Sequence, residues 1–104
     1  MSQELTEVQQ QQVTTGLMPK LAERQELINT YNQVIKLEMS EENSKKFREL
    51  RLLLVKNRTA MGEWKTREKA FYLAGGNFIQ ATYNKEIAVN KDMEAKLLEG
   101  EQYA

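Results

Sequence analysis

The stretch that decides the fold spans residues 44–78 and reads SKKFRELRLLLVKNRTAMGEWKTREKAFYLAGGNF. Its apolar residues recur at alternating intervals of three and four, the heptad pattern of a helix that packs along one stripe. Asn57 falls in the same rows, where a buried asparagine can fix the register of a coiled coil. The heptad rows predict a structural core of Phe47, Leu50, Leu54, Met61 and Trp64.

The long helix that this pattern predicts can continue or break at Gly75 and Gly76. Each glycine costs about 1 kcal/mol in a helix interior relative to alanine, and the apolar positions change phase after Phe78. A turn at the glycines would close a three-helix bundle. A continuous helix to Glu99 would extend about 80 Å and leave its second half uncovered.

Of these two outcomes we expect the second, in which the uncovered half of the helix is buried against a second copy of the chain. Soluble monomers seldom expose so large an apolar patch, so the chain is expected to form a homo-oligomer. The same surface could also receive another protein. The interface with a partner or a second copy is expected to comprise Phe71, Tyr72, Phe78, Tyr83 and Leu97.

Upstream of this stretch the sequence predicts a second helix over residues 19–39, with Pro19 in its first turn, where a missing N–H costs little. Only a short polar connection follows it, so the two helices should run antiparallel as a helical hairpin or coiled coil. The glutamine-rich residues 1–16 carry few apolar positions and are expected to form a flexible or partner-dependent arm. The organisation predicted is all-α, with this arm and a single helical coiled-coil domain over residues 17–104.

The composition excludes most enzyme classes. The 104 residues include no cysteine and no histidine, which removes disulfides, thiol nucleophiles and thiolate zinc sites. We therefore expect a protein that is not an enzyme and needs no cofactor. No apolar run approaches the roughly 18 residues of a membrane span, and the chain begins without a secretory signal pattern. A cytoplasmic protein without membrane contact is expected.

Charge is balanced overall, with 15 basic and 15 acidic residues, but residues 41–70 hold nine basic and five acidic side chains. Within this segment Arg51, Arg58 and Lys65 recur every seven residues on one edge of the heptad stripe. Such an edge could contact the phosphates of single-stranded DNA or an acidic partner. The alternative is a coiled-coil flank whose cations pair with glutamates of a neighbouring helix.

Three segments resemble a coiled-coil family found in proteins of tailed phages and prophages. Residues 48–59 match its ReLRLxLVKxRT pattern, residues 69–78 its KAFxLAxGxF pattern, and residues 93–101 its MExKLxExE pattern. The resemblance covers roughly residues 43–101. Members are often encoded near phage recombination and single-strand annealing genes, and many continue into a further region that has no counterpart after residue 104. The family assigns no catalytic residue that could be transferred.

Together these observations predict a non-enzymatic phage protein that acts by binding, as an accessory or scaffold in phage DNA recombination and metabolism within the bacterial cytoplasm. Two alternatives stay open. The chain could be a small inhibitor whose helices occupy a groove of a host protein, in host takeover or anti-defence. It could also be a structural component of the virion, with the coiled coil repeated in a symmetric array.

Overall fold

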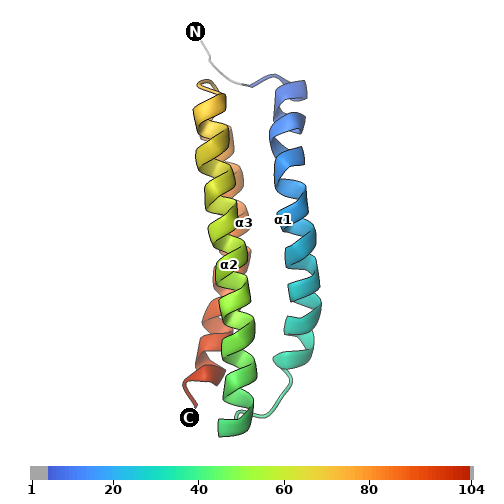
Figure 1. Cartoon of the computed structure of the whole chain (residues 1–104), viewed down its shortest axis with the longest axis vertical. Helices are drawn as coiled ribbons and strands as arrows, with labels where there is room; N and C mark the ends of the chain where they lie inside the picture. The colour runs from blue at the N-terminus through green and yellow to red at the C-terminus, as the bar shows by residue number, and fades with distance from the viewer. Residues whose placement is uncertain (1–4, 104) are drawn as a thin grey trace.

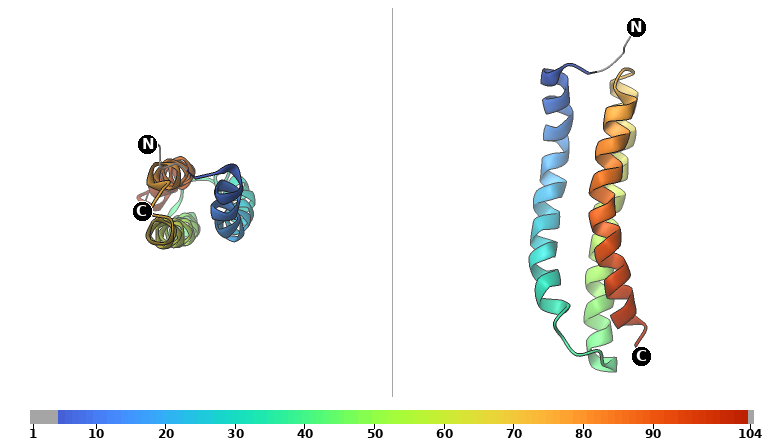
Figure 2. Two further views of the ribbon diagram at one scale, coloured as in Figure 1. Left: turned by 90° about the horizontal axis from the view of Figure 1, so that it is seen from above. Right: turned by 180° about the vertical axis from the view of Figure 1, so that it is seen from behind.

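The computed structural model describes residues 5–103, which form three α-helices and no strand. The helices α1 (Glu7–Val34), α2 (Glu41–Phe71) and α3 (Gly76–Glu101) run alternately up and down (Figure 1). The molecule is a rod of 56 × 19 × 16 Å. Seen from above, α2 and α3 lie side by side and α1 covers one flank of the pair (Figure 2). The all-α antiparallel hairpin predicted from the sequence is confirmed.

Helix α2 is the element that the heptad pattern describes. Its first turn is capped by Ser40, whose side chain accepts a hydrogen bond from the Asn43 N–H at 3.1 Å. Glu41 and Glu42 follow, and their charges favour a helix N-terminus. Asn57, the polar residue within the heptad rows, is fully buried. The predicted core residues Phe47, Leu50, Leu54, Met61 and Trp64 are all buried.

The chain turns back at the two glycines. Tyr72 leaves the helical region, and Gly75 has φ +85, a left-handed conformation that glycine adopts without a side-chain clash. Helix α3 starts at the next residue and packs antiparallel along α2 (Figure 2). The uncovered half-helix on which the expectation of an oligomer rested is therefore covered by α3 of the same chain. Self-association itself stays a prediction.

Helix α1 begins twelve residues earlier than the sequence predicted. The Thr6 side chain accepts from the Gln9 N–H and the Gln9 side chain accepts from the Thr6 N–H, a reciprocal capping box that satisfies two backbone donors. Pro19 lies inside the helix. The predicted arm over residues 1–16 is thus wrong for residues 5–16, because Val13 is fully buried in the bundle. Residues 1–4 of that arm lie outside the described part of the chain.

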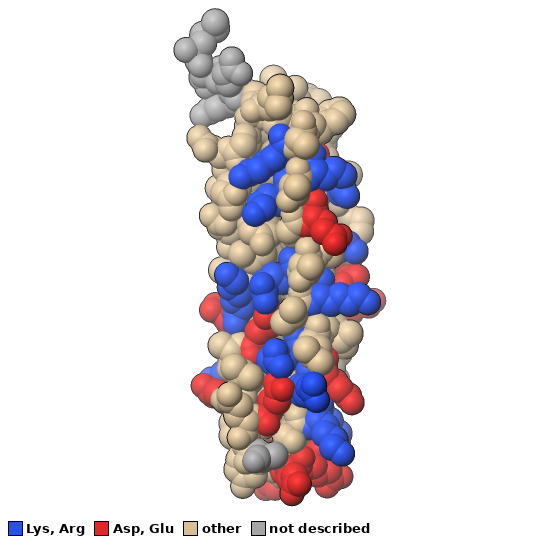
Figure 3. All heavy atoms as spheres, turned by 60° about the vertical axis from the view of Figure 1, so that its left-hand side comes forward, with Lys and Arg blue, Asp and Glu red and all other residues tan. Residues whose placement is uncertain are grey.

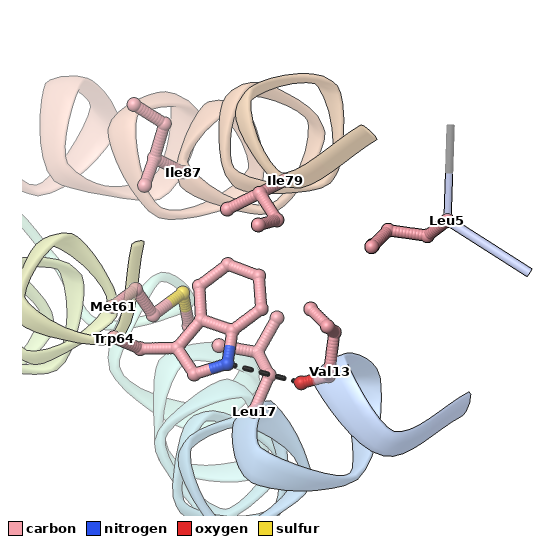
Figure 4. Packing of buried hydrophobic residues seen from close by; sticks show 7 residues of the cluster. All are labelled: Leu5, Val13, Leu17, Met61, Trp64, Ile79 and Ile87. Carbon is pink, nitrogen blue, oxygen red and sulfur yellow. Dashed lines mark hydrogen bonds between the residues drawn. The ribbon is translucent and has the colours of Figure 1, made fainter. Parts of the chain in front are cut away.

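The apolar core consists of two clusters, one toward each end of the rod. The cluster nearer the α2–α3 turn contains Leu5, Val13, Leu17, Met61, Trp64, Ile79 and Ile87 (Figure 4). The other contains Phe47, Leu50, Leu54, Met93 and Leu97. Along the helices, the buried polar pair Asn57 and Asn90 falls between the two clusters. A polar layer therefore interrupts the core near the middle of the bundle.

Candidate functional site

The basic edge predicted on α2 contacts α3. Arg51 donates from Nε and Nη2 to the two carboxylate oxygens of Glu101, at 2.5 and 3.1 Å. Arg58 makes the same two-pronged contact with Glu94, at 2.9 and 3.0 Å. A step of seven residues along α2 is matched by a step of seven in the opposite direction along α3, as antiparallel helices require. These pairs correspond to the flanking ion pairs of a coiled coil.

The electrostatics of this edge follow from the pairing. Hydrogen bonding to Arg51 holds the pKa of the Glu101 carboxyl below its usual value, and hydrogen bonding to Glu101 raises the pKa of Arg51. The third member of the edge, Lys65, places its Nζ 4.2 Å from the centre of the Tyr83 ring, within the range of a cation–π contact. The three cations of the predicted nucleic-acid site are thus bound by residues of α3.

The five residues expected at a partner interface do not share one surface. Leu97 is fully buried in the core, so its assignment to an outer interface is wrong. Phe78 and Tyr83 are half-buried and pack against the cluster nearer the turn. Tyr72 packs there too, and its hydroxyl donates to the Gln12 side chain at 3.3 Å. These four residues contribute to the closed bundle because α3 folds back over α2.

Phe71 alone of the five is largely exposed, at 75%, and the structure places Leu73 beside it with 92% of its surface exposed. The Phe71 ring stacks edge-on against Tyr72, with ring centres 4.8 Å apart. We call Phe71 and Leu73 the apolar tip. Leu73 lies outside the heptad rows, and a leucine just before an Ala-Gly-Gly turn has little helix surface on which to pack.

The last two turns of α2, which lead to the apolar tip, carry several basic side chains. Lys65, Arg67 and Lys69 lie in the last two turns of α2, and Lys69 donates to the Gln80 side chain. Glu68 is the acidic residue among them, and its Oε1 lies 3.9 Å from Arg67 Nε. The first turn of α3 adds no acidic residue. Basic side chains gather on the upper part of this face, whereas both signs mix farther down (Figure 3).

The polar layer in the middle of the bundle is the other concentration of polar groups. The amide nitrogen of Asn90 donates to the Asn57 side-chain oxygen and to the Leu54 carbonyl, both at 3.0 Å. Arg24 of α1 donates to the Asn90 side chain, to the Glu86 carbonyl and to the Glu86 carboxylate, at 3.3, 2.8 and 2.7 Å. These amides and the Arg24–Glu86 ion pair join the three helices at the middle of the bundle.

Residues 5–103 contain no group of three or more acidic side chains positioned to hold a metal ion. None of the helices in this described range combines the length and apolar character needed to cross a membrane. An open groove along the outer surface of α2, lined by Lys45, Arg48, Glu49 and Leu52, is formed by one helix and does not enclose a ligand. No protein-family model, curated protein or solved structure matches the chain.

Proposed function

We propose that this protein acts by binding another protein, that it catalyses no reaction itself, and that the apolar tip is its contact surface. The observation that carries the proposal is the exposure of Leu73 and Phe71, at 92% and 75%, where α2 ends and the turn to α3 begins. Large apolar and aromatic side chains held in fixed positions are typical anchors of protein interfaces. The two-pronged ion pairs Arg51–Glu101 and Arg58–Glu94 hold α2 against α3, which limits the entropy lost when the tip binds.

The chemistry of the tip indicates the kind of partner. Two apolar side chains require an apolar pocket, and the basic residues Lys65, Arg67 and Lys69 at the end of α2 favour an acidic rim around it. A negatively charged partner would associate faster at low salt because the basic rim attracts it over a distance. We therefore propose a protein partner with an apolar pocket bordered by aspartate or glutamate.

The phage family that residues 43–101 resemble supplies the biological setting of the proposal. In that setting the chain is an accessory or scaffold in phage DNA recombination, in the cytoplasm of the bacterial host. The engagement of Arg51 and Arg58 by Glu101 and Glu94 favours contact with a protein of that pathway over direct contact with single-stranded DNA. Inhibition of a host protein through the same tip, and a structural place in the virion, are the competing functions.

Photo-crosslinking from the tip tests this proposal. A photoreactive phenylalanine analogue replaces Phe71 in one sample and the exposed Thr59, on the side of α2, in a matched control. After irradiation in infected cells, cross-linked proteins are identified by mass spectrometry. The proposal expects a partner that is captured from Phe71 and lost in Leu73→Ser, and that is retained in Leu53→Ser, where a leucine is exposed at 50% elsewhere on α2. Equal capture from both positions would contradict it.

The identity of the captured protein separates the functions. A phage recombination protein supports the accessory role, a host protein supports the inhibitor, and a capsid or tail protein supports the virion component. Purified partner and chain can then be titrated at two salt concentrations. Binding that weakens as salt rises is expected from the basic rim, since screening shortens the reach of surface charge.

A further inference from the structure

Helix α1 is held less firmly than the other two helices. Among its 28 residues two are buried, against seven of 31 in α2 and six of 26 in α3. Its apolar residues Leu27, Ile28 and Tyr31 are only partly buried where they pack against the second cluster. The views of the bundle agree that α2 and α3 form a close pair and that α1 stands to one side (Figures 1 and 2). The α2–α3 pair thus presents a groove that α1 fills.

The polar layer defines which helix this groove accepts. From the groove, Asn57 donates to the Lys20 carbonyl and the Glu23 carboxylate of α1, at 3.0 and 3.1 Å. In the other direction, Arg24 of α1 forms an ion pair with Glu86 of α3. Removal of α1 would leave the Asn57 amide without these two acceptors and the Glu86 carboxylate without its cation. An occupant that satisfies both groups must supply acceptors for the Asn57 amide and, one helical turn after the carbonyl acceptor, an arginine for Glu86, as Lys20 and Arg24 of α1 do.

The contact of α1 with the layer is incomplete. The Arg24 Nε is buried and has no hydrogen-bond partner within residues 5–103. A buried donor without a partner carries its desolvation cost uncompensated. The unpaired Nε lowers the free energy needed to release α1 from the bundle. The ion pairs Arg51–Glu101 and Arg58–Glu94 meanwhile keep α2 and α3 together.

The segment that connects α1 to α2 can become helical, and so change its span, without a disallowed backbone conformation. Residues 35–40 read IKLEMS and include no glycine and no proline. All six residue types are tolerated in helices, and Leu37 and Met39 are exposed at 36% and 48%. The turn is maintained by the Ser40 cap and by the Asn43 side chain, which donates to the Glu38 carbonyl at 2.9 Å. If residues 35–40 became helical, α1 would extend away from its own groove.

We propose that α1 exchanges between two copies of the chain, so that the Arg24 of one copy pairs with the Glu86 of the other in a domain-swapped dimer. The occupant follows from the groove: α1 of a second copy brings the same carbonyl, carboxylate and guanidinium at the same spacing. The opened 35–40 segment supplies the reach, and short hinge segments are known to promote swapping. This inference is independent of the apolar tip and of its partner.

Complementary charge reversal tests the exchange. In the Arg24→Glu variant two acidic side chains face each other between α1 and its own groove. In the Glu86→Arg variant two basic side chains face each other there. In a swapped heterodimer both grooves regain an opposite-charge pair. The two variants are warmed together to near their melting temperature, cooled and analysed by native mass spectrometry. The proposal expects a species of twice the 12.1 kDa chain mass, enriched about tenfold or more over either variant alone, the ratio that one lost pairing of about 1.4 kcal/mol gives.

The control carries both substitutions, Arg24→Glu and Glu86→Arg, in one chain. It regains a matched pair within the monomer, so warming and cooling should not enrich its dimer over that of the unsubstituted chain. A mixture of the two single variants that stays monomeric, or a dimer formed equally by each variant alone, would overturn the exchange.

A second measurement covers the case in which a reversed variant fails to fold. Since the chain has no cysteine, one copy can carry Gln12→Cys and another Tyr72→Cys, at positions whose side chains touch within the bundle. A short bismaleimide should join the two copies after warming and cooling. Cross-linking should increase when Ser40→Ala weakens the turn, and it should fall when glycine replaces Leu37 and Met39, because glycine disfavours the continuous helix. Equal cross-linking with and without warming would count against exchange of α1.

Discussion

Trp64 donates its indole N–H to the main-chain oxygen of Val13 at 3.1 Å, and its side chain is 1% exposed (Figure 4). The bond joins the last third of α2 to the first half of α1, next to Leu17 in the same apolar cluster. Because Trp64 is the only tryptophan of the chain, its fluorescence reports on this junction alone. The indole both fills the core and holds α1.

Replacing Trp64 separates these two contributions. Trp64→Phe keeps an aromatic ring but loses the hydrogen bond to Val13, and it should lower the free energy of unfolding by about 1–3 kcal/mol. Trp64→Ala also leaves a cavity and should cost about 3–5 kcal/mol. Urea unfolding followed by circular dichroism measures both. A Trp64→Phe variant as stable as the parent would show that the bond to Val13 contributes nothing.

The pair Arg58–Glu94 is suited to a double-mutant cycle. Arg58→Gln, Glu94→Gln and the double variant should reveal a coupling free energy of about 0.5–1 kcal/mol, at the upper end for partly exposed pairs because two hydrogen bonds form. Thermal unfolding of the four proteins gives the value. Additive effects would mean that the two-pronged contact is not maintained in solution.

Substituting the whole basic edge gives a further expectation. Arg51→Gln, Arg58→Gln and Lys65→Gln together should lower the melting temperature, because each cation is bound by a residue of α3. Any weak binding to single-stranded DNA should keep the same dependence on salt. A salt dependence made shallower by about three ionic contacts would restore the edge as a phosphate-binding site. Fluorescence anisotropy with a labelled oligonucleotide decides between the two results.

Stability should depend on pH through Glu101. Its pKa is lowered in the folded chain by the hydrogen bond from Arg51, while the unfolded carboxyl titrates near its ordinary value of about 4.3. The stabilisation is therefore complete above that value and is lost as the pH falls through the lower, folded-state pKa. Glu101→Gln should be less stable than the parent at pH 7, and the difference should shrink below pH of about 4. Arg51→Gln should reduce the same acid dependence in a titration of melting temperatures.

Two glycines of α3 should respond in opposite ways to alanine. A Cβ at Gly100 would lie 2.5 Å from the Phe47 ring, whereas a Cβ at Gly76 would meet nothing within 4 Å. Gly100→Ala should therefore cost about 1–3 kcal/mol by overpacking. Gly76→Ala should be neutral or stabilise the chain by up to about 1 kcal/mol. Equal effects would mean that the end of α3 does not pack on Phe47 as described.

The core of α2 was predictable because large apolar residues such as Leu54 and Trp64 mark its heptad rows without ambiguity. The apolar pattern does not reveal the extent of α1, because Val13 and Leu17 are the only buried residues of this helix and stand among glutamines and threonines. The capping box formed by Thr6 and Gln9 was nevertheless present in the sequence as a signal. Packing of Val13 and Leu17 against Trp64 stabilises α1 although the helix has few apolar residues.

The candidate site was less predictable than the core. Spacing alone placed Arg51 and Arg58 on one edge, but the choice between phosphates and glutamates depends on the register of α3 along α2. That register is set by the turn at Gly75, which the heptad pattern left open. Leu73 belongs to neither helix, so no periodicity applies to it, and only the three-dimensional turn shows that it is exposed beside Phe71.

The contact of Leu5 with Gly75 matters for how the molecule is handled. Leu5 side-chain atoms fill the space beside Gly75, so the N-terminal side of the chain passes directly over the turn that presents Phe71 and Leu73. The C-terminal side lies at the opposite end of the rod (Figure 1). An affinity tag or a sensor-chip attachment at the N-terminus would crowd the apolar tip, whereas immobilisation through the C-terminus would orient every molecule with its tip toward the solution.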